Sequence, residues 1–551
     1  MKLSTDNINN TIKSILFLFI CAGMSFYCIS LIYNILEYPY FFFSDQHEQV
    51  FKMIIPEVPI LKHYPSRFDI LTGIEFFPIV RSSWTIQHIM SAFYYIQSFK
   101  ILVFFIAMLY IMSLLSNKTI SFLLFSIFIF FGETTVDLLS TLSHTIFPDT
   151  TLAFLIVLFF IFYLFALKKD STLLYLFSIL CACILTYMKE PSFIIFLPLI
   201  FFNGFLNWKN NTKKEKIFNI LLFLNCIIFI IMYIMYAYSP GSNYASGRSP
   251  FTFFENIKYV LSFSYYITLN IIILLIKSIY YIKIKCKFIK IYDIILLSSL
   301  GYTFAFFILN LNAKYYFLPS YALSFIAYSG YVYDIVFKYN SKKFLQELYQ
   351  YLLFTLSIIF IIINLLNISK FDIQLHTDLK IITRPYSLFM VELEKNNIPV
   401  KSFLRTIDSY KRQHFRDISY WHYFTTKVFY SLYSLPKDRR NIYKTENEIV
   451  KNINKDIIKT KNELFNSMDN GAIVQLSPIE ISTVSQWNNE NYRIIDGYFT
   501  KFIYNKKYES DIHDAYCRFI ERVFKNSKQN IRPKFDILYE QAQERQCIMQ
   551  K

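Results

Sequence analysis

The fold is decided by residues 148–191, PDTTLAFLIVLFFIFYLFALKKDSTLLYLFSILCACILTYMKEP, which hold two apolar stretches joined by a short basic turn. Each stretch is close to the length that an α-helix needs to cross a bilayer. The turn carries Lys168 and Lys169, whereas the outer ends carry Asp149 and the turn 189–191, Lys-Glu-Pro. Because short lysine-rich loops stay in the cytoplasm, we predict two membrane helices whose acidic and proline-containing ends face outward.

The same pattern recurs through the first two thirds of the chain. Lysine-rich linkers alternate with linkers that hold acids, histidines and prolines. This alternation predicts a cytoplasmic N-terminus and, after an odd number of spans, a C-terminus on the outer side. By length and flanking residues we predict about eleven spans, at residues 14–36, 98–116, 119–132, 150–167, 172–188, 192–206, 217–237, 258–281, 291–310, 315–337 and 350–367.

Composition excludes the common soluble classes. Of its residues, 54% are hydrophobic and 20% are aromatic. A soluble protein with that composition would leave too much apolar surface exposed to water. Its formal net charge of +17 would suggest nucleic acid in a soluble protein. Here much of that charge lies in the predicted cytoplasmic loops, where it orients helices against an anionic leaflet. We therefore predict a multi-pass protein in contact with membrane lipid, with no nucleic-acid partner.

Two regions are predicted to lie outside the membrane. The first outer loop, residues 37–97, is long and partly apolar, which suits short helices in the membrane interface. Residues 369–551 are long enough for one ordinary domain. The predicted organisation is therefore an α-helical polytopic membrane module, residues 1–368, followed by an extracytoplasmic α/β domain that is mostly helical.

The patterns within the C-terminal domain predict a few of its elements. Residues 446–468 and 513–525 have helical periodicity, and residues 472–476 form a short strand candidate. Cys517 and Cys547 are the only cysteines of this region. They could form a disulfide if the domain lies outside the cytoplasm, or both could be free thiols.

Asp45 and Glu48 follow the first span in the motif Ser-Asp-Gln-His-Glu-Gln. A spacing of three residues puts both carboxylates on one face of a helix, beside the membrane surface. There, a carboxylate can act as general base on a hydroxyl group that reaches hydrogen-bond distance. The alternative is a solvated polar turn that ends the span.

The next candidates lie near the outer ends of later segments. Asp69 belongs to the first outer loop, where a salt bridge to a nearby arginine is the alternative role. His144 could donate to a phosphate or a sugar hydroxyl, or could simply be exposed. Asp149 precedes the fourth span, where capping of that helix is the alternative.

Lys189 and Glu190 lie between two apolar spans, where charges are expensive and tend to serve function or pairing. The alternative is that they pair with each other or with Asp149. Arg248 belongs to a glycine- and serine-rich outer loop and could close over an anionic substrate, or be solvated.

Lys314 opens the tenth predicted span together with Tyr315 and Tyr316. A helix N-terminus plus an ammonium group makes a binding site for an anion such as a lipid-linked phosphate. For the two tyrosines, the alternative is an ordinary aromatic belt at the membrane interface.

Taken together, these motifs resemble the GT-C superfamily of polytopic membrane glycosyltransferases. The family carries an acidic motif after its first span, an Asp before its fourth and a Lys-Gly-Pro-like turn after its fifth. Here residues 45–48, 147–149 and 189–191 take those places, and residues 314–319 match a basic residue with Tyr and Pro at a late span. The first motif departs from the family, because it reads Asp-Gln-His-Glu instead of Asp-Glu.

The resemblance implies transfer of a sugar from a polyprenyl-phosphate-linked donor to a surface glycan or lipid-linked acceptor, on the outer face of the bacterial inner membrane. By this analogy Asp45, or else Glu48, is the catalytic base, and no metal or cofactor takes part. The residues expected to contact substrate are His47, Asp69, His144, Asp149, Lys189, Glu190, Arg248, Lys314, Tyr315 and Tyr316.

Two other functions fit the sequence less well. An O-antigen or capsule polysaccharide polymerase or ligase also has many spans, but its large outer loop usually lies between late spans. A non-catalytic transporter or scaffold is the second. A transporter would show charged helices and repeats, and the predicted spans show few charges and no repeat.

Overall fold

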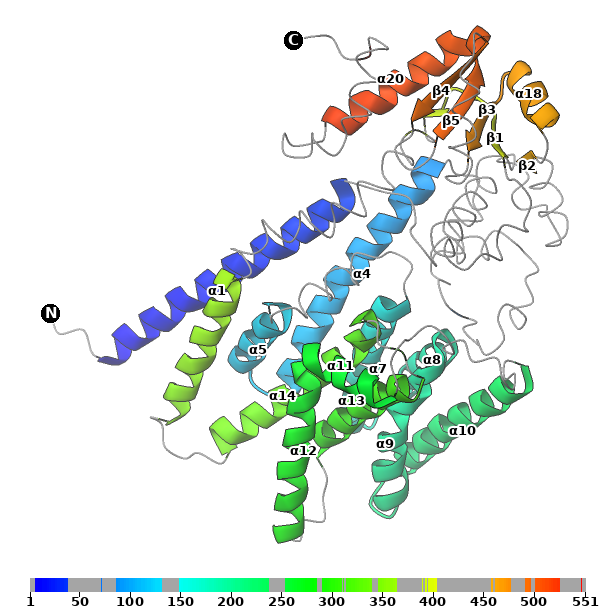
Figure 1. Ribbon diagram of the computed structural model, residues 1–551. Helices are drawn as coiled ribbons and strands as arrows, with labels where there is room; N and C mark the ends of the chain where they lie inside the picture. Colours follow the sequence, from blue (N-terminus) through cyan, green and yellow to red (C-terminus); the bar gives the residue numbers. More distant parts are fainter. Residues whose placement is uncertain are drawn as a thin grey trace. The chain divides into compact units, whose positions relative to one another are not determined.

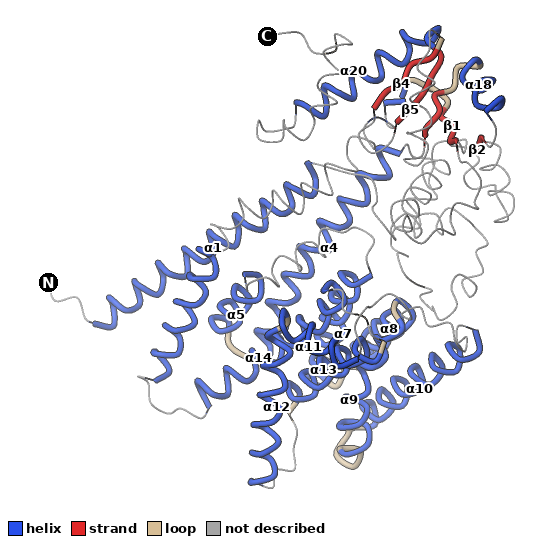
Figure 2. Tube along the Cα trace, in the orientation of Figure 1, coloured by secondary structure: helices blue, strands red, loops and turns tan. Residues whose placement is uncertain are grey.

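The computed structural model describes residues 5–37, 71, 86–130, 148–236, 253–284, 290–309, 311, 314–338, 345–363, 389, 392–393, 395–403, 457–458, 461–476, 491–496, 501–525 and 547. The chain divides into two compact units. The first comprises Met1–Tyr33, Pro59–Thr72 and Ile96–Phe371, and the second comprises Asn34–Val58, Gly73–Tyr95 and Asp372–Lys551. Among the described residues, all the strands belong to the second unit (Figure 2).

Up to residue 363 the described chain is helical (Figure 1). Its helices are α1 (Thr5–Glu37), α4 (Ile86–Leu115), α5 (Lys118–Phe130), α7 (Pro148–Lys169), α8 (Thr172–Met188), η2 (Glu190–Phe196), α9 (Leu197–Leu199), η3 (Ile200–Leu206), α10 (Lys213–Tyr236), α11 (Phe253–Phe263), α12 (Tyr265–Ile284), α13 (Ile291–Ile308), η4 (Lys314–Phe317), α14 (Leu318–Tyr333), η5 (Asp334–Lys338) and a last helix, Leu345–Ile363.

The apolar helices make the chain a multi-pass membrane protein. Six described helices are long and apolar enough to cross a bilayer, and the bent pair formed by α11 and α12 could add a seventh. Each segment predicted as a span contains a helix, but Lys118–Ile129, Thr172–Met188 and Glu190–Leu206 are short. The predicted total of about eleven spans therefore stays a prediction.

The chain breaks sharply after α8, at Lys189. This residue is extended, with φ −155° and ψ 128°, and it ends α8 and begins η2 at once. Pro191 favours the break, because it has no N–H to continue the hydrogen bonds of α8 and is well suited to the first positions of a new helix, here η2. The predicted span 192–206 is consequently a mixed segment, in which 3₁₀, α and π turns follow one another.

Helices α12, α13 and α14 are joined by hydrogen bonds between small polar side chains. Thr303 and Ser320 hydroxyls lie 2.6 Å apart, and Asn270 donates to Ser324 at 2.8 Å. The Ser299 and Ser324 hydroxyls lie 2.9 Å apart. In lipid, helices gain no hydrophobic drive to associate, so small residues and interhelical hydrogen bonds hold them together.

Gly330 allows a close approach between α13 and α14. A Cβ atom added there would overlap the ring of Tyr292. We expect Gly330→Ala to destabilise the protein by about 1–3 kcal/mol, as overpacking of a well-filled core does. Thermal unfolding in detergent would measure this effect.

Gly204→Ala is the matched control, because its added Cβ would meet its nearest neighbours at 3.6 Å, an ordinary contact. If Gly330→Ala and Gly204→Ala both unfold at the wild-type temperature, α13 and α14 do not make the tight contact described here.

The second unit contains a five-stranded sheet with the order β2-β1-β3-β5-β4. Its elements are β1 (Val400–Phe403), β2 (Ile457–Ile458), α18 (Lys461–Asp469), β3 (Ile473–Leu476), β4 (Tyr492–Asp496), β5 (Lys501–Asn505), η8 (Lys506–Tyr508) and α20 (Glu509–Lys525). Strand β1 runs parallel to β2 and β3, whereas β5 runs antiparallel to β3 and β4. Leu464 and Met468 of α18 pack on Val474 and Ile503 of the sheet.

The sequence predicted this domain only in part. The strand at 472–476 is confirmed as β3, and the helix at 513–525 lies within α20. The helix predicted at 446–468 is wrong at Ile457–Ile458, which form β2. These two β-branched residues pair with the edge of β1, so sheet pairing overrides local helical periodicity.

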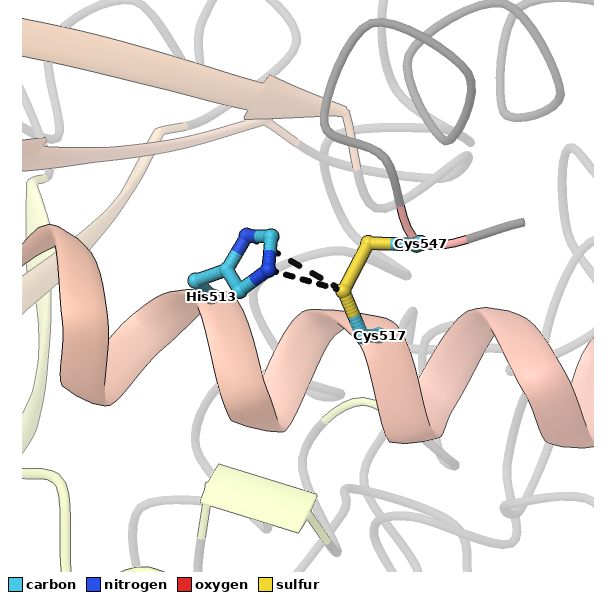
Figure 3. Close-up of a disulfide and its surroundings, with 3 residues drawn as sticks. All are labelled: His513, Cys517 and Cys547. Carbon is cyan, nitrogen blue, oxygen red and sulfur yellow. Dashed lines mark hydrogen bonds between the residues drawn. A yellow bond between two sulfur atoms is a disulfide. The ribbon is translucent and has the colours of Figure 1, made fainter. Parts of the chain in front are cut away.

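Cys517 and Cys547 form a disulfide, which settles the alternative left open by the sequence (Figure 3). His513 lies one helical turn before Cys517, with its Nε2 atom 3.4 Å from the Cys517 sulfur. In the described part of the chain, these three residues form the group whose ligand atoms are close enough for a metal ion, within 4.8 Å of one another. Because both sulfurs are joined to each other, we assign the group as a disulfide.

Candidate functional site

A buried ion pair lies where α7 begins and α8 ends. Asp149 is the second residue of α7, and its carboxylate accepts a hydrogen bond from the Lys189 ammonium group. Asp149 is 0% exposed and Lys189 is 5% exposed. Of the pairings that the sequence allowed for Lys189, the structure shows the one with Asp149. Charges buried in a membrane protein are expensive, and they mark functional sites by default.

Aromatic rings from two later segments cover the ammonium group. The Lys189 nitrogen lies 4.3 Å from the centre of the Tyr316 ring in η4 and 5.3 Å from that of Phe306 in α13. The two rings stack on each other with their centres 4.9 Å apart. Such cation–π contacts gain strength where water is excluded. The pair is thus enclosed by residues far apart in the sequence.

Tyr302 extends the same site along α13. Its ring contacts Phe306 edge to face, with 5.1 Å between centres, and its side chain is fully buried. Asp149, Glu190 and Tyr316 are near enough to act electrostatically on its hydroxyl group. Among the described residues, that hydroxyl has no hydrogen-bond partner.

A second lysine, from α4, contacts the first turn of α7. The Lys100 ammonium group donates to the hydroxyl of Thr151 at 3.0 Å, two residues after Asp149. Leu71, from the predicted first outer loop, also contacts this region, because its backbone N–H donates to the Tyr187 carbonyl at 3.0 Å. Tyr187 lies two residues before Lys189. The site therefore collects charged and polar groups from the middle of α4, the start of α7 and the turn after α8.

The structure brings together part of the predicted set. Asp149, Lys189 and Tyr316 meet, and Glu190 lies within electrostatic reach of the same cluster. The backbone of Lys314 and Tyr315 belongs to η4, next to Tyr316, but their side chains are outside the described residues. Outside the described residues altogether are Asp45, His47, Glu48, Asp69, His144 and Arg248.

Sequence reasoning missed three residues of the site: Lys100, Tyr302 and Phe306. Lys100 carried a usable signal, because it is a charge within an apolar segment. Tyr302 and Phe306 carried none, because the chain has 44 tyrosines and 60 phenylalanines, many of them within predicted spans. Only the packing of α13 against η2 and η4 distinguishes these two rings from the others.

Chemically, the arrangement can hold an anion. The Lys189 ammonium group is kept in place by one carboxylate oxygen and two aromatic faces, so little side-chain freedom remains to be lost on binding. An ammonium group in a water-excluded pocket acts on a nearby negative charge far more strongly than it does in water. Asp149 sits in the first turn of α7, where the helix dipole favours its negative charge.

No protein-family model and no curated protein matches the chain. Among solved structures, the chain is similar to ArnT from Cupriavidus metallidurans. The apo crystal structure matches with a TM-score of 0.43 and 8% identity, over 90% of this chain and 98% of ArnT. The structure bound to undecaprenyl phosphate matches with a TM-score of 0.44 and 10% identity, over 88% and 97%. Both TM-scores lie below 0.5, so no residue role and no activity is inferred from them.

Proposed function

We propose that the chain is a membrane glycosyltransferase that moves a sugar from a polyprenyl-phosphate-linked donor to a surface glycan or lipid-linked acceptor. The observation that carries this proposal is the buried Lys189–Asp149 pair enclosed by Tyr316 and Phe306. If the pair had only a structural role, apolar side chains of similar size could replace it, because buried ion pairs add little stability by themselves. A buried ammonium group is useful where it stabilises an anion that forms and departs during a reaction.

The reaction that fits this buried ammonium group leaves a phosphate behind. The acceptor oxygen attacks the anomeric carbon, the bond from that carbon to the phosphate oxygen breaks, and the acceptor proton passes to a carboxylate. Polyprenyl phosphate departs with an additional negative charge. Placing a preorganised cation where that charge develops is often the largest single contribution to catalysis. Lys189 takes this role, with Lys314 and Arg248 as further cations.

The base and the remaining substrate contacts come from the outer loops. Asp45, or Glu48 in the other register, deprotonates the acceptor hydroxyl, because a carboxylate beside the membrane surface suits that task. His47, Asp69, His144, Glu190 and Tyr315 contact the sugar or the acceptor. Leu71 supports the assignment of Asp69, two residues before it in the chain, because the Leu71 backbone N–H donates to the Tyr187 carbonyl, two residues before Lys189.

The proposal includes an orientation in the bacterial inner membrane. The alternating lysine-rich loops support a cytoplasmic N-terminus and about eleven spans. Residues 1–368 then form the catalytic module, and residues 369–551 form a periplasmic domain. The disulfide between Cys517 and Cys547 supports that location, because disulfides persist in oxidising compartments.

The test supplies the purified protein, in lipid nanodiscs, with a sugar on undecaprenyl phosphate and with the same sugar on a nucleotide. The acceptors are lipid-linked saccharides and surface glycan isolated from the source cells. We expect release of undecaprenyl phosphate and a product extended by one sugar, with the lipid donor only. Transfer from the nucleotide donor, or a long polymeric product, would contradict the proposed reaction.

A further inference from the structure

The hydroxyl group of Tyr302 is buried without a hydrogen bond in the described part of the chain, and buried polar groups seldom lack one. The residue is fully buried, and its hydroxyl finds no hydrogen-bond partner in the described part of the chain. Roughly 90% or more of buried polar groups in proteins have a partner, so each exception calls for an explanation. A ligand that completes the missing hydrogen bond is one such explanation.

The position of Tyr302 is held by the backbone and does not depend on the hydroxyl. Helix α13 packs against η2, where the Ser298 hydroxyl donates to the Ile195 carbonyl at 2.7 Å. At Gly301, an added Cβ would meet Ile194 at 3.2 Å, so the two segments are in close contact directly beside Tyr302. Segment η2 begins at the Lys189 turn, so the same contact fixes Tyr302 relative to Lys189.

Tyr302 and Lys189 also share Phe306. The ring of Tyr302 lies 5.1 Å from the Phe306 ring, and the Lys189 nitrogen lies 5.3 Å from it. The charge balance near Phe306 then matters, because the Asp149 carboxylate already takes up the charge of Lys189. An entering anion therefore needs donors that bring no further negative charge. A neutral phenol hydroxyl is such a donor.

We propose that Tyr302 donates a hydrogen bond to a phosphate oxygen of the polyprenyl-linked substrate. This inference rests on the proposed function, and it makes Tyr302 a specificity residue for the phosphate group. Tyr302 contributes a neutral, directional contact from the side of α13, next to the Lys189–Asp149 pair. The lipid phosphate completes the hydrogen bond that the buried hydroxyl lacks.

The test compares binding of undecaprenyl phosphate with binding of undecaprenol, which has the same chain and no phosphate. Wild-type protein in nanodiscs is expected to prefer the phosphate lipid. Tyr302→Phe removes one hydroxyl, and we expect it to weaken undecaprenyl phosphate binding by about 10- to 100-fold, the range for a hydrogen bond to a charged group. Undecaprenol binding should stay unchanged.

Tyr175→Phe is the matched control. Tyr175 is buried, and its hydroxyl also lacks a hydrogen-bond partner among the described residues, but it lies near the start of α8, the end opposite Lys189. The control variant should bind both lipids as the wild type does. Equal weakening in the two variants would show a general packing effect and overturn the assignment to Tyr302.

Thermal unfolding without lipid provides the second measurement. Because the hydroxyl makes no hydrogen bond within the described protein, Tyr302→Phe should melt at or above the wild-type temperature. A clear drop would reveal a structural hydrogen bond and overturn the proposal. The two failures are distinguishable: a wild type that does not prefer the phosphate lipid refutes the proposed function, whereas an unchanged preference in Tyr302→Phe refutes only the role of Tyr302.

Discussion

Lys189→Met is expected to lower the rate of sugar transfer by about 100- to 1,000-fold, the loss seen when one preorganised donor to a developing anion is removed. The same change leaves the Asp149 carboxylate buried without its ion-pair partner. Breaking a buried pair in this way costs about 3–5 kcal/mol of folding free energy. The variant should therefore lose both transfer, measured with the lipid-linked donor, and thermal stability.

A double variant separates these two losses. In Asp149→Asn with Lys189→Met, neither position leaves an unpaired charge buried, so the unfolding temperature should return most of the way to that of the wild type. Sugar transfer should stay low, because the cation is still missing. Recovery of transfer together with stability would show that the pair serves only the fold.

Lys214→Met gives the matched control for a lysine–aspartate pair. Lys214 pairs with Asp170 at 3.1 Å, with side-chain exposures of 42% and 52%. Exposed pairs of this kind contribute about 0–1 kcal/mol, so we expect little change in stability and none in transfer. A large effect here would mean that the assays respond to any loss of positive charge.

Cys547→Ser is expected to lower the unfolding free energy of the second unit by about 3–4 kcal/mol in the chain-entropy model. The disulfide closes a loop with a sequence separation of 30, and removing it gives that loop back its freedom in the unfolded chain. Limited proteolysis and denaturant unfolding of the full-length protein would measure the loss. Cys183→Ser, which removes a free cysteine of α8, is the control and should leave this unit unchanged.

The bridge also tests the predicted membrane orientation. If the second unit is periplasmic, Cys517 and Cys547 should resist alkylation in intact cells until a reductant is added. Free reaction of both thiols without reductant would contradict the predicted outer location of the C-terminal domain.

Much of the helical architecture could be predicted because the signal is local. A long apolar run such as residues 150–167 has to form hydrogen bonds within itself when it lies in lipid, so its composition alone indicates a helix. Residues 150–167 lie within α7, and residues 172–188 coincide with α8. Pro191 also marks, from sequence alone, a place where the helix has to end.

The second unit was harder to predict because its strands are short and depend on their neighbours. Residues 457–458 fit a helical pattern, yet they pair with β1, more than 50 residues away in the chain. Short strands have weak intrinsic preferences, so the partner decides the structure.

By itself the sequence determined that this protein is a membrane protein and where its principal helices lie, and it gave a set of candidate site residues that includes Asp149, Lys189 and Tyr316. Only the tertiary structure decided that Lys189 pairs with Asp149, 40 residues away in the chain. It alone selected Lys100, Tyr302 and Phe306 from many similar residues. The physical reason is that hydropathy is a property of each segment, whereas a binding site depends on which helix ends meet, and that is set by packing between segments far apart in the chain.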